Sequence, residues 1–427
     1  MGGAVFRPYG VLFSQPPRML ATIGRGLLVR SRRIRQQNAF ACVSLRTLYK
    51  DNKIQSTSGT YDDSIPKHDF KPRQVFYAFD PAISSINTPP LGNFSFLLPT
   101  NVPAIPEFQH VHAIPPDALG VPWPTSFPTT LESKYWREAE HAAKDFLQFT
   151  LANQPDRAND CRFIDGIADA AVSFAVHVAP MGDVARMKVL AKAYVLLFMH
   201  DDAIETGNYA AAIPTAGQVL SQDSPSLATQ YRGYHLLSEE VLFEDPTLGQ
   251  YLLDGMLSWG SLDVKTYPDT FSSLGDYLVH RVEDVGAYPI FRTAEFACGL
   301  QLSEQKNDTA DSLRALCARH LLLTNDLYSY AKEARAEEQD GAKLFNAVCV
   351  VQQLTGVSAP CATGIVRHIL WDIERQISGE YGQLVRESSP SESVRARVLI
   401  AAVSGNMYFS ATSARYARTI DGAKLAR

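Results

Sequence analysis

The chain has 427 residues, a formal net charge of −5, 46% hydrophobic residues and 20% charged residues. This composition is ordinary for a globular protein, and the length allows one large domain or two of average size. The longest strictly apolar run near the middle of the chain, residues 193 to 199, is far too short to cross a bilayer. We therefore expect no stable membrane insertion.

The first 50 residues contain nine Arg or Lys residues and no Asp or Glu. Such a leader is typical of an organelle transit peptide; the alternatives are a disordered basic arm and residues that precede the true translation start. The remainder of the chain is acidic and would repel phosphate, so we expect no nucleic-acid partner. Six cysteines without a Cys-x-x-Cys pair indicate reduced thiols. We predict a cytoplasmic protein, or a mitochondrial one if residues 1–50 are a transit peptide.

Residues 51–128 are rich in Pro, Ser, Asn and Asp and show no sustained period. Proline fixes φ and removes a hydrogen-bond donor, so this segment is predicted to be an irregular wrap or linker. Helical signals dominate from residue 129 to 427, and no alternating run supports a sheet. The helical segments are expected at about 130–153, 162–178, 183–206, 224–244, 246–263, 274–300, around 325–333, and at 342–354, 359–378 and 391–416.

Asn325, Ser329 and Glu333 recur at i, i+4 and i+8 within a segment that otherwise has the pattern of a buried helix. Each step of four residues advances about 400°, so the three side chains form one line on one face. Amide, hydroxyl and carboxylate oxygens suit Mg²⁺. The alternative is a solvated helix face with accidental spacing.

A second polar group ends an earlier helix, whose start we assign to the cap residue Asp183. Asp201, Asp202 and Glu205 crowd the last turn, where unsatisfied carbonyls already carry partial negative charge. A metal cluster would supply the missing positive charge, with Asp201 and Glu205 stacked at i, i+4. The alternative is a solvated acidic helix end.

Four motifs together resemble those of class I terpene cyclases, and of the fungal type in particular. Their order and approximate spacing agree with that family over residues 130–420. Phe409 departs from the family because many relatives have Trp there, and the long leader has no counterpart in the motif set. The motifs are Asp201-Asp202-x-x-Glu205, Arg281 with its following segment, Asn325-Asp326-x-x-Ser329-x-x-Lys332-Glu333, and Arg415-Tyr416.

The resemblance implies an all-α fold, a single helical bundle around a central cavity, preceded by the long irregular N-terminal segment. It also implies three Mg²⁺ ions that assist departure of the diphosphate. The implied metal group comprises Asp201, Asp202, Glu205, Asn325, Ser329 and Glu333, although Asp202 is expected to organise nearby arginines more than to bind metal directly. The implied diphosphate donors are Arg281, Lys332, Arg415 and Tyr416.

The cavity below these groups should be apolar and aromatic, because a carbocation is stabilised by π faces. Our candidates for its wall are Tyr194, Phe198, Tyr408 and Phe409. Ordinary core packing is the alternative for each, since aromatic residues at helical spacing are usually core.

The function predicted from the sequence is Mg²⁺-dependent ionisation of a linear prenyl diphosphate, followed by cyclisation and release of diphosphate. Farnesyl diphosphate is favoured as the substrate, and geranylgeranyl diphosphate is the alternative. Two further readings are less favoured: an isoprenyl diphosphate synthase, which needs two aspartate-rich motifs where only one qualifies, and a non-catalytic helical scaffold with a basic arm. The protein is expected to be a monomer or homodimer.

Overall fold

The protein is represented by a computed structural model that describes residues 71–82, 92–152, 155–205, 232–260, 268, 270–300, 308–341 and 343–425. The basic leader and the predicted helical residues 224–231 lie outside the described residues. The boundaries predicted for the three segments 1–50, 51–128 and 129–427 stay a prediction.

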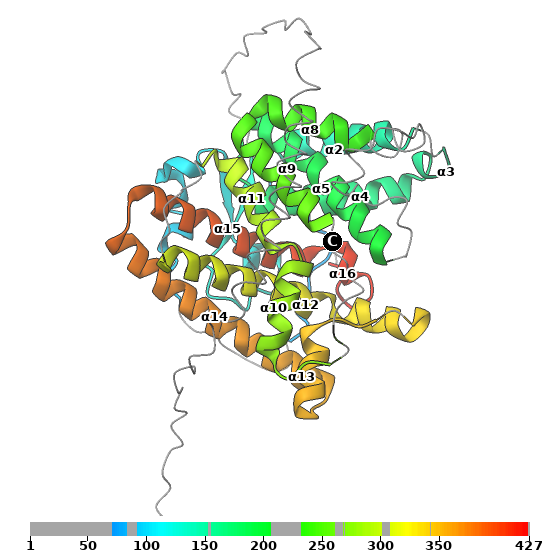
Figure 1. Cartoon of the computed structure of the whole chain (residues 1–427), viewed down its shortest axis with the longest axis vertical. Helices are drawn as coiled ribbons and strands as arrows, with labels where there is room; N and C mark the ends of the chain where they lie inside the picture. Colours follow the sequence, from blue (N-terminus) through cyan, green and yellow to red (C-terminus); the bar gives the residue numbers. More distant parts are fainter. Residues whose placement is uncertain are drawn as a thin grey trace, which may run out of the picture. The chain divides into compact units, whose positions relative to one another are not determined.

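The all-α prediction is confirmed, since helices make up most of the described chain (Figure 1). The described part of the Pro-rich segment contains no α-helix; it forms strand β1 (Val111–Ile114) and short 3-10 helices at Ser95–Leu97, Val102–Ala104, Pro106–Phe108 and Pro116–Leu119. The helices are α2 (Trp136–Thr150), α3 (Pro155–Ala158), α4 (Cys161–Val178), α5 (Val184–Glu205), α8 (Arg232–Glu244), α9 (Pro246–Gly260), α10 (Leu274–Asp284), α11 (Ala287–Cys298), α12 (Asp308–Asp340), α13 (Ala347–Thr355), α14 (Ala359–Glu387), α15 (Pro390–Thr412) and α16 (Ala414–Ala417).

The expectation of helix from residue 130 was wrong, because Thr130–Ser133 forms strand β2. It pairs antiparallel with β1 (Val111–Ile114). All four β2 residues are buried, and the strand packs against α4 and α15. Because neither face of the strand meets water, its sequence does not alternate between apolar and polar residues. Its partner strand lies inside the Pro-rich segment.

The single helix predicted for residues 274–300 is two helices. Gly286 adopts φ 68°, a left-handed conformation that ends α10 and precedes α11. The Trp259 indole donates a 2.7 Å hydrogen bond to the Asp284 carbonyl at this break. The last predicted helix is likewise divided: Ser413 separates α15 from α16, and its hydroxyl accepts a 3.2 Å hydrogen bond from the Arg415 amide. The breaks at Gly286 and Ser413 set the directions of α11 and α16, which line the site described below.

The long helix α12 packs against both α14 and α15, and α14 lies along the edge of the helical body (Figure 1). Helix α5 packs on α2 and α4, and α15 also packs on α4. Gly405 permits the last contact, since a Cβ at this position would lie 1.9 Å from the His177 carbonyl oxygen. The predicted cap of α5 is also present, with the Asp183 carboxylate accepting a 2.9 Å hydrogen bond from the Arg186 amide.

Within the described residues, no helix on its own is long and apolar enough to cross a membrane. Helices α13 and α14 meet the length and composition criteria only as a pair, and that pair is bent by 112°.

Candidate active site

A cavity of about 470 Å³ opens between the helices of the body. Helices α4, α5, α11, α12 and α15 contribute to its wall, and residues 343 and 345 lie at its mouth. Predicted metal-binding and diphosphate-binding residues from four helices line this one cavity: Asp201, Arg281, Asn325, Ser329, Lys332, Glu333, Arg415 and Tyr416.

The α12 side of the mouth carries Asn325, Ser329 and Glu333 in the line expected from their spacing. Asn325 accepts a 3.2 Å hydrogen bond from Arg281 and donates one of 2.9 Å to the Tyr416 hydroxyl. Glu333 accepts a 2.9 Å hydrogen bond from the Asn346 amide. Desolvation raises the pKa of the Glu333 carboxyl, whereas the Arg281 charge lowers it. These side chains are therefore fixed by neighbours on α10, α16 and the start of α13.

The α5 side of the mouth is more open. The Asp201 and Asp202 side chains are 44% and 34% exposed, and Arg415 bridges them. The Arg415 guanidinium lies 2.6 Å from the Asp201 carboxylate and pairs with Asp202 as well. Asp202 thus contacts an arginine, the arrangement expected for it. The side chain of Glu205 lies outside the described residues.

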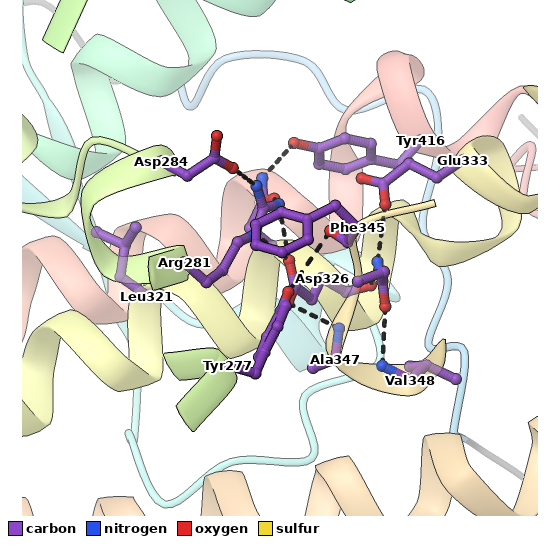
Figure 2. Close-up of polar contacts among 12 residues, drawn as sticks. Tyr277, Arg281, Asp284, Leu321, Asp326, Glu333, Phe345, Ala347, Val348 and Tyr416 are labelled. Carbon is purple, nitrogen blue, oxygen red and sulfur yellow. Dashed lines mark hydrogen bonds and ion pairs between the residues drawn. The ribbon is translucent and has the colours of Figure 1, made fainter. Parts of the chain in front are cut away.

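Arg281 connects the α12 side of the mouth to the interior (Figure 2). Its guanidinium contacts Asp284 on its own helix, Asn325 on α12 and the fully buried carboxylate of Asp326. Burial lowers its pKa, but the charge of Asp326 and other nearby acidic groups outweigh that effect, so the pKa of Arg281 lies above its usual value. Arg281 therefore stays charged beside the cavity.

Below the mouth the wall is aromatic. Phe174 meets Tyr194, Phe198 and Phe409 edge to face, with ring centroids 4.9, 5.7 and 4.8 Å apart. All four residues line the cavity. Phe174 was not predicted, because α4 is apolar on nearly every side and no stripe singles out one phenylalanine.

The prediction for Tyr408 was wrong, because this residue does not line the cavity. Its ring packs on His177 at 4.5 Å and on Trp123 at 6.3 Å, and it borders a separate pocket next to residues 73–77. Tyr408 and Phe409 are consecutive on a helix and so point about 100° apart. Only Phe409 can face the cavity.

The α12 donors fit a hard divalent cation. An amide oxygen, a hydroxyl and a carboxylate are the oxygen ligands such an ion takes. The Ser329 hydroxyl is buried and lies close enough to Glu333 to lower the pKa of its carboxyl, yet it forms no hydrogen bond of normal geometry within the described chain. A buried hydroxyl without such a bond is costly unless a ligand satisfies it. Among the described residues, no three His, Cys, Asp or Glu side chains form a metal site by themselves, so Asn325 and Ser329 are needed for one.

Comparison with known proteins agrees with this geometry. Residues 265–376 match the family described as "Terpene synthase family 2, C-terminal metal binding". The chain is 30% identical over 366 residues to terpene cyclase aneC of Aspergillus aculeatus, covering 81% of this chain and 82% of that protein. It is 29% identical to terpene cyclase 6 of Gibberella fujikuroi, covering 83% and 97%.

The fold is also found among solved structures. A variant of the protein SVS_A2, from ancestral sequence reconstruction, superposes with a TM-score of 0.52 at 16% identity, covering 65% of this chain and 85% of that chain. The fold and the relatives define a class of helical lyases built around a cavity. The chain belongs to the terpene cyclase family, of the fungal class I type, and is an enzyme.

Asp326 belongs to the motif that begins at Asn325, but no role was predicted for it from the sequence. Its position between two predicted site residues was a usable signal, because a buried carboxylate beside Asn325 requires a cationic partner. The structure supplies that partner as Arg281, 2.8 Å away.

Proposed function

We propose that the protein ionises a linear prenyl diphosphate and guides the resulting carbocation to a cyclic hydrocarbon, with release of diphosphate. One observation carries the proposal: oxygen donors from α5 and α12 and cationic donors from α10, α12 and α16 meet at the mouth of one aromatic cavity. The mouth suits the charged diphosphate, and the wall suits the isoprenoid chain.

Asp201, Asn325, Ser329 and Glu333 would hold Mg²⁺ ions, three in all if the family pattern applies, with Glu205 as a further candidate. The bound metal neutralises charge that develops on the departing diphosphate. Arg281, Lys332, Arg415 and Tyr416 would donate hydrogen bonds to the phosphate oxygens. Because Arg415 already pairs with Asp201 and Asp202, it can bring the diphosphate next to the acidic side of the mouth.

The aromatic wall would act on the cation. The Phe174, Phe198 and Phe409 rings line the cavity, and a cation above a ring face gains about 0.5–2 kcal/mol. That range is enough to favour one cyclisation branch over another. The Tyr194 hydroxyl shares a 2.5 Å hydrogen bond with Thr293, so this ring is held in place.

Farnesyl diphosphate is the proposed substrate. It is the substrate that the family resemblance favours, and the cavity of about 470 Å³ lies within the usual range for small-molecule sites, roughly 300–1,000 Å³.

The test is to incubate purified protein with farnesyl or geranylgeranyl diphosphate, with Mg²⁺ or with a chelator, and to identify hydrocarbons by gas chromatography and mass spectrometry. Cyclic 15-carbon products that require Mg²⁺ are expected. Products from geranylgeranyl diphosphate alone would overturn the substrate assignment. A parallel incubation with added isopentenyl diphosphate tests the main alternative: linear, elongated diphosphates there would indicate a chain-elongating synthase. Absence of any turnover would overturn the proposed function.

A further inference from the structure

The Asp326 carboxylate is completely buried behind the cavity mouth and is not part of the cavity wall. One of its oxygens accepts a 2.9 Å hydrogen bond from Arg281 Nε, and a terminal nitrogen of the same guanidinium lies 2.8 Å away in the ion pair. The other oxygen accepts from the Tyr277 hydroxyl at 2.5 Å and from the Ala347 amide at 3.0 Å. Three hydrogen bonds and the ion pair together fix the orientation of this carboxylate.

Tyr277 and Arg281 lie one turn apart on α10 and approach Asp326 from the same face (Figure 2). Tyr277 is completely buried, so its hydroxyl has no access to water. The Phe345 ring packs edge to face on Tyr277 at 5.1 Å and lies 5.6 Å from the Arg281 guanidinium. The guanidinium is thus held by a carboxylate and flanked by an aromatic ring.

The remaining contacts of the Arg281 guanidinium go to Asp284 and Asn325, and both of these residues line the cavity. One part of the guanidinium is therefore committed to Asp326, and another part lies at the mouth. A donor whose direction is fixed before the charged group arrives needs no reorganisation when that charge develops.

We propose that Tyr277 and Asp326 are positioning residues for Arg281: they fix the orientation of its guanidinium toward a diphosphate at the mouth. This inference rests on the proposed function, because it takes a diphosphate as the group that Arg281 meets. Tyr277 acts through Asp326 and touches neither the cavity nor the substrate.

The first test is Tyr277→Phe, which removes the hydroxyl and keeps the ring. Binding of inorganic diphosphate in the presence of Mg²⁺ is measured by calorimetry, together with kcat and KM for the prenyl diphosphate. Loss of one hydrogen bond to a charged group should weaken diphosphate binding roughly tenfold and lower kcat by a similar factor. The matched control is Tyr328→Phe, which also removes a buried hydroxyl from a contact with an arginine, Arg367, at 3.2 Å. The control should leave diphosphate binding unchanged.

A double-mutant cycle with Arg281→Ala separates positioning from a general effect on folding. If Tyr277 acts through Arg281, Tyr277→Phe should have no further effect on diphosphate binding in the Arg281→Ala background. Asp326→Asn provides the second variant if Tyr277→Phe does not fold, and its effect should vanish in that background in the same way.

The positioning role would be overturned if Tyr277→Phe weakened diphosphate binding equally in the wild-type and Arg281→Ala backgrounds. It would also be overturned if Tyr328→Phe weakened diphosphate binding as much as Tyr277→Phe. If the cycle gives the expected result with inorganic diphosphate but the wild-type protein turns over no prenyl diphosphate, the proposed function alone is refuted. Wild-type protein that binds no inorganic diphosphate would refute both.

Discussion

The two sides of the cavity mouth hold their oxygen donors in different ways. On α12, Asn325 is hydrogen-bonded to both Arg281 and Tyr416, and Glu333 is hydrogen-bonded to Asn346. On α5, the Asp201 and Asp202 side chains are between one third and one half exposed, and Arg415 bridges them.

The difference separates two tasks within one proposed metal site. The α12 side is preorganised, because neighbouring side chains hold Asn325 and Glu333 by hydrogen bonds before any ligand arrives. The α5 side can adjust, because exposed carboxylates are held weakly and solvent screens them. We expect substitutions on the α12 side to affect turnover more than those on the α5 side.

The largest effect is expected for Asn325→Ala. It removes a proposed metal ligand together with hydrogen bonds to Arg281 and Tyr416, so turnover should fall roughly 1,000-fold. Helical content, measured by circular dichroism, should not change. The control is Asn101→Ala, an exposed asparagine remote from the mouth. Turnover of Asn325→Ala within a few-fold of wild type would remove the metal assignment for α12.

The contrast between exposed and buried carboxylates can also be tested away from the mouth, at Glu132. Burial raises the pKa of its carboxyl to about 7, although the Arg73 amide and charge lower it. Its neighbour His177 stays neutral in this range, because burial lowers the pKa of that imidazole to about 3. As pH rises from about 4.5 to above 7, the unfolded Glu132 releases a proton that the folded one retains, so the contribution of Glu132 to stability should fall by up to about 3 kcal/mol. The unfolded His177 imidazole also loses its proton in this range and opposes the fall, so the Glu132 contribution is read as the difference between wild type and a Glu132 variant.

Glu132→Gln should remove this loss and so be more stable than wild type at pH 8 but not at pH 4.5. Denaturant unfolding at the two pH values measures the difference. A wild-type free energy of unfolding that does not fall relative to the variant between these pH values would contradict the raised pKa.

A smaller effect is expected for Asp201→Asn on the α5 side. Turnover should fall roughly 30-fold, since one proposed ligand loses its charge. The free energy of unfolding should change by less than about 0.5 kcal/mol, because the ion pair with Arg415 is partly exposed. A loss of turnover equal to that of Asn325→Ala, or a large destabilisation, would erase the distinction between the two sides.

The smallest effect is expected below the mouth, for Phe174→Leu. Replacing an edge-to-face partner of three aromatic rings should change product ratios by an amount equivalent to about 1 kcal/mol, with little change in total turnover. Phe163→Leu on the same helix is the control, because Phe163 is not part of the cavity wall. An identical product profile in the Phe174 variant would assign that ring to ordinary packing.

The α12 donors were predictable because a spacing of four residues places polar side chains on one line, whatever the helix packs against. Tyr408 was not distinguishable from Phe409, because α15 is buried on all sides and periodicity then carries no direction. The break at Gly286 was missed because apolar periodicity continues across it. Strand β2 was missed because its pairing partner lies about twenty residues upstream, in a segment without strand signals. In each case contacts between distant parts of the chain decided the outcome.

The contact between Gly405 and the His177 carbonyl has an evolutionary consequence. Phe174 and Phe409 lie on the two helices that this contact brings together, so the width of the hydrocarbon chamber depends on a position where only a hydrogen atom fits. If the rings steer cyclisation as proposed, descendants of this sequence can acquire new products by exchanging them, whereas any side chain in place of the glycine would force α4 and α15 apart.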